Sequence, residues 1–178
     1  TNCQIWDTKW RGAGIPPVIS LDEHGEPTFL HVLSEDNLKS HRYYYVRREK
    51  GKWKQTPICN SNHQWNSSYL ARDKKGILHA YVIVGEGYLE GGYMNRHGGG
   101  RIEKWISQDK GNSWKKSRDL MADQKEFGNW RFNNIQPVVR PDGSIVEGML
   151  LFYGWKDKEA PEAKAFLLHE EVTQSSPN

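Results

Sequence analysis

The sequence lacks the features that would mark a membrane protein or an unprocessed secretory precursor. No run approaches the roughly 18 apolar residues that a membrane-spanning helix needs. The first ten residues, TNCQIWDTKW, have neither the charged start nor the apolar centre of a signal peptide. We therefore expect a soluble chain from which any export signal has already been removed.

Cysteine and net charge are also scarce. Cys3 and Cys59 are the two cysteines and no CxxC pair occurs, which excludes a dense disulfide framework and a zinc site of that type. We expect buried thiols, with a single disulfide or a shared metal as the alternatives. The 25 basic and 22 acidic residues give a formal charge of +3, far from the basic stripe of a nucleic-acid-binding protein. We expect neither nucleic acid nor a membrane as a partner, and the mildly basic surface suits an anionic substrate.

Aromatic residues, by contrast, are abundant in a polar chain. They make up 12% of the 178 residues, with 8 Trp and 8 Tyr, although the mean hydropathy is only -0.85. Trp and Tyr combine an apolar body with a polar group, so they either fill the space between sheets or line a binding surface.

Three segments share one pattern, in which a short apolar run is followed by a turn with Asp and Gly and by a second apolar run. Asp bonds the backbone of its own turn and Gly accepts a positive φ, so each segment predicts a β-hairpin. A second pair of strands follows the first two hairpins, and KAFLLHEE follows the third. The three segments are PPVISLDEHGEPTFLHVL (16–33), SSYLARDKKGILHAYVI (67–83) and QPVVRPDGSIVEGMLLFYGW (136–155).

These units of four antiparallel strands predict an all-β fold made of β-propeller blades. Helix signals are poor: 119–130 has room for one helical turn, and Pro161 interrupts the helix-forming residues of 156–168. We expect about three blades and divide the chain accordingly. The divisions are 1–15 (the end of a preceding blade or an N-terminal extension), 16–58 (a blade), 59–118 (a blade), 119–172 (a partial blade) and 173–178 (a disordered tail).

The most specific motif is SQDKGNSW, from Ser107 to Trp114. We expect Asp109 to accept backbone N–H bonds within the turn, Gly111 to adopt an unusual dihedral, and Trp114 to fill the gap between neighbouring sheets. The motif resembles the Asp box, S/T-x-D-x-G-x-T/S-W/F, of the BNR-repeat, sialidase-like β-propellers. Its expected role is structural, because the box fixes a turn and does not itself indicate catalysis.

Three blades do not close a ring, and the third lacks an outer strand. Open sheets with exposed apolar faces tend to associate. We therefore expect the missing blades to come from the same longer protein or from another subunit. The resemblance also implies a secreted or periplasmic protein.

Propeller topology divides the loops between two faces. The turns within hairpins, such as DEHG, DKKG and PDG, are ordinary solvated turns on one face. The other face, which carries the substrate in sialidase-like propellers, receives nearly all of the unusual His, Arg, Trp, Asn and Tyr residues. Its loops are SEDNLKSH (34–41), CNSNHQWNS (59–67), GEGYLEGGYMNRHGGGR (85–101), DLMADQKEFGNWRFNN (119–134) and GWKDKEAPEAK (154–164).

Ten residues of this face are the candidate site. His63, Tyr93 and His97 are the candidate catalytic residues, because imidazole and phenol groups transfer protons. The candidate substrate-binding residues are Trp65, Asn66, Arg96, Arg101, Trp130, Arg131 and Asn133. Trp65 is a platform for a sugar ring or a wedge between blades, and Arg131 is a bidentate carboxylate clamp or a structural ion pair.

These group types are the ones required for β-elimination from a uronic-acid polysaccharide. An Arg or a divalent metal neutralises the carboxylate, a His or Tyr removes the C5 proton, and a second such group protonates the leaving oxygen. The resemblance therefore implies a polysaccharide lyase that acts on an acidic polysaccharide or oligosaccharide. His63 and His97 are then base and acid, Tyr93 is an alternative acid, and arginines bind the carboxylate.

Two further functions remain open. One is a carbohydrate-binding propeller without chemistry. The other is a glycoside hydrolase, which needs two carboxylates, and Glu86 and Glu90 are candidates. Classical sialidase activity is not supported, because the family's N-terminal arginine motif is absent from these residues.

Overall fold

The computed structural model describes residues 4–9, 17–34, 40–87, 97–121, 124–156 and 162–170. The chain is all-β, with antiparallel sheets of four, four and three strands. The first sheet contains β1 (Val18–Leu21), β2 (Pro27–Ser34), β3 (His41–Glu49) and β4 (Lys52–Ser61). The second contains β5 (Ser68–Arg72), β6 (Leu78–Val84), β7 (Arg101–Ser107) and β8 (Lys115–Asp119). The third contains β9 (Trp130–Val139), β10 (Ile145–Lys156) and β11 (Ala163–His169).

The hairpins and their partner strands are confirmed, since neighbours in sequence are neighbours in each sheet. The single helical turn expected near 119–130 is α1 (Gln124–Phe127). One boundary was wrong: 130–134 begins strand β9, and is not part of a crossover loop. Those residues pair with β10, as Trp155 with Arg131 and Gly154 with Phe132, so sheet pairing overrides the polar, loop-like composition.

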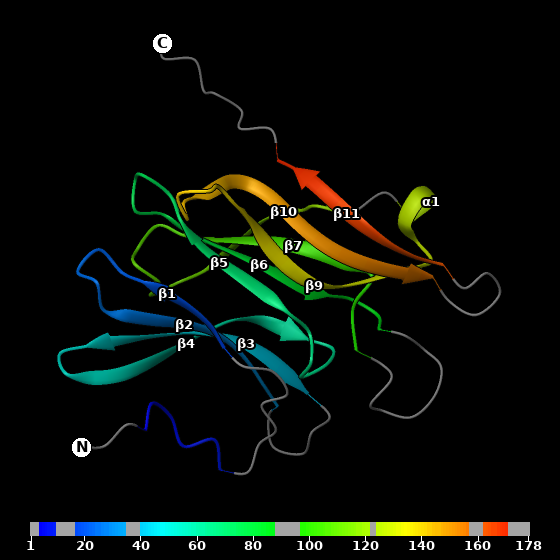
Figure 1. Ribbon diagram of the computed structural model, residues 1–178. Helices are drawn as coiled ribbons and strands as arrows, with labels where there is room; N and C mark the ends of the chain where they lie inside the picture. The colour runs from blue at the N-terminus through cyan, green and yellow to red at the C-terminus, as the bar shows by residue number, and fades with distance from the viewer. Residues whose placement is uncertain are drawn as a thin grey trace.

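The second sheet lies between the other two (Figure 1). Its strand β6 is buried on both faces, with alternate residues directed to opposite sides. Ala80 and Val82 belong to the core shared with the first sheet, whereas Tyr81 and Ile83 belong to the core shared with the third. This explains why β6 is a nearly continuous apolar run, a pattern typical of strands covered on both faces.

The turn between β7 and β8 has the hydrogen bonds expected from its sequence. Oδ1 of Asp109 accepts from the backbone N–H of Ser113 at 2.9 Å and from the Ser107 hydroxyl at 2.7 Å. Hydrogen bonds from Ser113 and Ser107 hold the pKa of Asp109 well below its usual value. Gly111 has a φ of 83°, and a Cβ there would lie 2.1 Å from Cε1 of Tyr45. Only glycine therefore fits at this position.

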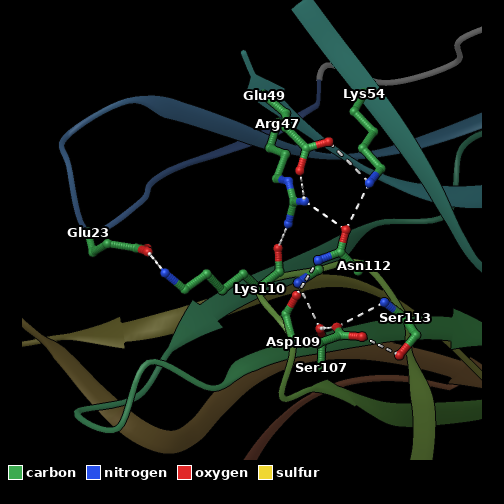
Figure 2. Close-up of polar contacts among 10 residues, drawn as sticks. Glu23, Arg47, Glu49, Lys54, Ser107, Asp109, Lys110, Asn112 and Ser113 are labelled. Carbon is green, nitrogen blue, oxygen red and sulfur yellow. Dashed lines mark hydrogen bonds and ion pairs between the residues drawn. The ribbon is translucent and has the colours of Figure 1, made fainter.

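The same turn joins the second sheet to the first (Figure 2). The Arg47 side chain on β3 donates to the carbonyl oxygen of Lys110 and to Oδ1 of Asn112, and Lys54 on β4 donates to the same Asn112 oxygen. Trp114 packs against Tyr45 at 5.5 Å between ring centroids and borders the core shared by the two sheets. The expected place of Trp114 between sheets is confirmed.

The large apolar side chains that stay exposed lie on the two outer sheets within the described part of the chain. They are Ile19, Leu21, Val139, Ile145, Tyr153 and Leu167. Ile19 and Leu167 are exposed to 65% and 64%, on strands β1 and β11. The described part of the chain has no helix that could span a lipid bilayer.

Candidate functional site

Antiparallel pairing brings the long connections of all three sheets to one end of the molecule, which we call the crossover end. The connections are β2–β3, β4–β5, β6–β7, β8–β9 and β10–β11. The short hairpin turns, including the turn at Asp109, lie at the opposite end. The structure thus gathers most of the sequence-predicted site residues at one end.

Five rings from the three sheets pack together at the crossover end, and we call them the His–Trp cluster: His41, His63, Trp65, His97 and Trp155. The His63 ring centroid lies 5.9 Å from that of His41, 5.4 Å from that of Trp65 and 6.3 Å from that of His97. His97 lies 6.1 Å from Trp65 and 5.4 Å from Trp155. Neither His41 nor Trp155 is among the predicted site residues, although both lie in loops predicted to belong to this face.

His63 is fully buried, and its Nδ1 accepts a hydrogen bond from the backbone N–H of Trp65 at 3.0 Å. Because Nδ1 is an acceptor, the neutral ring carries its proton on Nε2. A ring in this state cannot take a proton at Nε2, and protonation at Nδ1 would break the bond to Trp65. The structure thus places His63 as a buried ring whose Nδ1 is used by the backbone, and the base role of His63 stays a prediction.

The glycine run 98–100 is held tightly beside the cluster. Gly99 pairs with Phe132 of β9 through two backbone hydrogen bonds of 2.8 and 3.0 Å. A Cβ on Gly99 would lie 2.3 Å from the carbonyl oxygen of Val84, and one on Gly98 would lie 2.8 Å from Cη2 of Trp155. These glycines permit close contact between strands and fix His97, the residue before them.

Asn66 and Asn133 are buried, and their amides are used inside the protein. Oδ1 of Asn66 accepts from the N–H of Gly98 at 2.7 Å, and Nδ2 of Asn66 donates to Oδ1 of Asn62 at 2.6 Å. Asn133 accepts from the N–H of Ser67 at 2.7 Å and donates to the Trp65 carbonyl oxygen at 3.2 Å. These amides support the β4–β5 connection, and the substrate contacts expected for both residues stay a prediction.

A polar cleft of about 380 Å³ lies next to the glycine run. It is lined by Gly85, Glu86, Gly100, Arg101, Asp119, Gly128 and Arg131. Arg101 lies at the start of β7, with 46% of its side chain exposed, and forms long ion pairs with Glu103 at 3.7 Å and Asp119 at 4.0 Å. Its guanidinium group is therefore accessible to an anion.

Arg131 is mostly committed to the protein itself. Nε donates to the carbonyl oxygen of Gly87 at 3.0 Å, and Nη1 donates to those of Trp130 at 3.0 Å and Gly128 at 3.2 Å. Nη2 faces Glu86 at 3.7 Å. Most N–H groups of Arg131 therefore bind the protein itself, as expected for a structural role. Nη2 is the nitrogen that faces the cleft, beside Glu86.

Trp130 does not lie on the surface as a platform. It is buried in the core shared with the second sheet, with Lys156 Nζ over its ring at 5.1 Å and Lys164 Nζ at 5.6 Å. These neighbours cover the ring, and the substrate contact expected for Trp130 stays a prediction. Trp65 and Trp155 are half-buried and flank His97 instead.

Two predicted site residues, Tyr93 and Arg96, lie outside the described residues. Within the described residues, Asp73, His79 and Glu147 form a group able to hold a metal ion, with one ligand atom of each within 4.8 Å of the others. Asp73 follows β5 and His79 lies near the start of β6, so this group is at the hairpin end, away from the His–Trp cluster. Cys59 is a free, half-buried thiol, and burial raises its pKa to about 12.

Comparisons with known proteins show a likeness in fold alone. No family model and no curated relative matches the sequence. A protein of unknown function from Dyadobacter fermentans DSM 18053 aligns over 90% of this chain and 40% of its own, with 12% identity and a TM-score of 0.51. The endo-arabinase from Bacteroides thetaiotaomicron VPI-5482 aligns over 89% of this chain and 56% of its own, also with 12% identity and a TM-score of 0.51.

The chain therefore spans about half the length, or less, of these two solved structures. At 12% identity, the likeness to the endo-arabinase concerns the all-β fold.

Proposed function

We propose that the three sheets are blades of a β-propeller that is completed by further blades from the same longer protein or another subunit. Strand β5 packs between β1 and β9, as expected if the first strand of each blade lines a central axis. Exposed apolar side chains lie on the two outer sheets, where further blades would cover them. The endo-arabinase neighbour, a glycosidase with a propeller fold, supports the same arrangement. Light scattering tests it: a stable, dispersed monomer of 20.6 kDa would refute the incomplete ring.

We propose that the crossover end cleaves an acidic polysaccharide by β-elimination at a uronic acid. The observation that carries this proposal is the His–Trp cluster beside a cleft that contains Arg101 and Arg131. Half-buried Trp65 and Trp155 offer apolar faces for sugar rings, and the two arginines offer positive charge for a carboxylate.

Each group then has a defined part in the elimination. Arg101 binds the uronate carboxylate and stabilises the negative charge that develops on it during proton removal. His97 takes the C5 proton, and the released electron pair forms the C4–C5 double bond as the C4–O bond breaks. The leaving oxygen takes a proton from Tyr93, which we retain as the acid on sequence grounds.

A glycoside hydrolase is the second candidate, because Glu86 and Asp119 line the same cleft. Hydrolysis of a glycosidic bond generally requires two carboxyl groups, one as acid and one as base or nucleophile. The likeness to an endo-arabinase favours this alternative as well. The Glu86→Gln and Asp119→Asn variants would abolish hydrolysis but would leave β-elimination largely intact.

The experiment mixes the assembled protein with a panel of uronic-acid polysaccharides and records the ultraviolet absorbance of unsaturated sugar ends. Absorbance should rise for at least one polymer, and His97→Gln should abolish the rise. His24→Gln is the matched control, because its side chain is 75% exposed in the β1–β2 turn at the other end. New reducing ends without absorbance would identify a hydrolase, and bound but unaltered glycan would identify a binding protein. Either result would refute the lyase.

A further inference from the structure

We infer that Asn62 and Asn66 form an amide clamp that positions His97 for proton transfer. The inference rests on the proposed function for its catalytic meaning, but its geometry is independent of any substrate. Nδ2 of Asn62 donates to the carbonyl oxygen of Gly98 at 2.7 Å, and the N–H of Gly98 donates to Oδ1 of Asn66 at 2.7 Å. Both backbone groups of the residue after His97 are therefore held by the β4–β5 connection.

The clamp is closed by a bond between its two amides. Nδ2 of Asn66 donates to Oδ1 of Asn62 at 2.6 Å, and also to the Ser61 hydroxyl at 3.2 Å. Asn66 is fully buried, so water cannot readily replace these bonds. Each Asn acts as donor and acceptor at once. An Asp at either position would lose the donor, and Ala would lose both groups.

Gly98 has no freedom to move away from the clamp. Its φ is 87°, and the position of a Cβ would lie 2.8 Å from Cη2 of Trp155 and 3.1 Å from the carbonyl oxygen of Phe132. The next residue, Gly99, is paired with Phe132 of β9. The backbone after His97 is thus fixed by a side chain of the third sheet, by strand β9 and by the clamp.

His97 itself lies between the rings of Trp65 and Trp155, at 6.1 and 5.4 Å. Trp65 lies between the two clamp residues in sequence. The short β4–β5 connection therefore positions both the Trp65 ring and the backbone next to the His97 imidazole. Loss of the clamp leaves the ring contacts but releases the backbone. Because a misplacement of about 1 Å in a catalytic group costs up to about 100-fold in rate, we expect a fall in kcat rather than a rise in KM.

The test compares Asn62→Ala and Asn62→Asp with Asn60→Ala, a matched control at an exposed Asn at the end of β4. Three quantities are measured on the assembled protein: kcat and KM for elimination, the thermal midpoint, and the imidazole NMR signal of His97, assigned with His97→Gln. We expect kcat to fall about 10- to 100-fold in both clamp variants. The His97 signal should shift and broaden in them, and Asn60→Ala should change neither kcat nor this signal.

The outcomes separate the clamp from the proposed function. A lower thermal midpoint with an unchanged His97 signal and unchanged kcat in the folded protein would show a merely structural role and overturn the inference. An inactive wild-type protein whose His97 signal responds to Asn62→Asp would refute the lyase and leave the clamp supported. Asn62→Asp has the volume of the native residue, so the test stands if the alanine variant fails to fold.

Discussion

Replacement of Glu170 by Gln should weaken the attachment of the third sheet to the second. Glu170 follows β11, and only 6% of its side chain is exposed. Lys104 Nζ donates to its two carboxylate oxygens at 2.8 and 2.9 Å, the Tyr81 hydroxyl donates at 3.0 Å, and Arg118 forms a further ion pair. Lys104, Tyr81 and Arg118 all belong to the second sheet, so Glu170 is a polar link between two sheets.

The expected cost follows from burial. A hydrogen bond between charged groups contributes about 1.5–3 kcal/mol, and Gln keeps one acceptor but directs an NH₂ group at cations. Arg118 is 47% exposed and can be solvated, so its ion pair contributes little to the free energy of unfolding. Lys104 is only 14% exposed, so its hydrogen bonds contribute most of the stabilisation. We therefore expect Glu170→Gln to lower the free energy of unfolding by about 2–3 kcal/mol at neutral pH. The control, Glu162→Gln, removes exposed ion pairs with Lys156 and Lys164 and should lower the free energy of unfolding much less than Glu170→Gln does.

The pH dependence gives a second, independent check. Burial alone would raise the pKa of Glu170, but its hydrogen bonds with Lys104 and Arg118 outweigh this effect and leave the pKa below its usual 4.5. The unfolded chain then binds the proton first as the pH falls, so the stabilisation is complete above the unfolded-state pKa and is lost as the pH falls through the folded-state pKa. Urea unfolding at several pH values should show wild type and Glu170→Gln converging in acid. A difference below about 0.5 kcal/mol at neutral pH, or one that persists in acid, would refute the reasoning.

Two further predictions concern packing and reactivity. Gly99→Ala places a Cβ 2.3 Å from the Val84 carbonyl oxygen and should lower the free energy of unfolding by about 3 kcal/mol. The control, Gly76→Ala, has a φ of 82° but open space around the Cβ, so it should lower the free energy of unfolding by about 1 kcal/mol. Equal urea midpoints for the two variants would contradict this prediction. Cys59, with its pKa raised to about 12 by burial, should react with iodoacetamide at mildly alkaline pH far more slowly in the native protein than in urea. Peptide mass spectrometry separates Cys59 from Cys3, and equal rates in the two states would contradict the expected protection.

Local patterns were enough to predict the strands and their order. In β6, alternate residues supply the cores on either side, and the sequence LHAYVIV carries that information within seven residues. The Asp109 turn was equally predictable, because its bonds join residues at most four apart. Antiparallel order puts the long connections at one end of each sheet.

The sequence places the candidate site residues in particular loops, but it does not give the surroundings of each side chain. The rings of His63, Trp65 and His97 do pack together. Three other predicted residues, Trp130, Asn66 and Asn133, are buried. Trp155 also packs against His97, although it was not among the predicted site residues. Polar composition identifies a loop that carries chemistry, but it does not say which side chain faces solvent, because exposure depends on what another sheet covers.

The all-β class, the strand order and the turn at Asp109 could be predicted from local residues, since these features depend on contacts within a hairpin. Three features depend on packing between distant segments: the burial of His63, the hydrogen bonds of Arg131 to backbone carbonyl oxygens, and the clamp between Asn62 and Gly98. Asn62 and Gly98 are 36 residues apart. Their bond exists because two separate connections are packed against each other by Trp155 and β9, a relation that no local pattern of residues encodes.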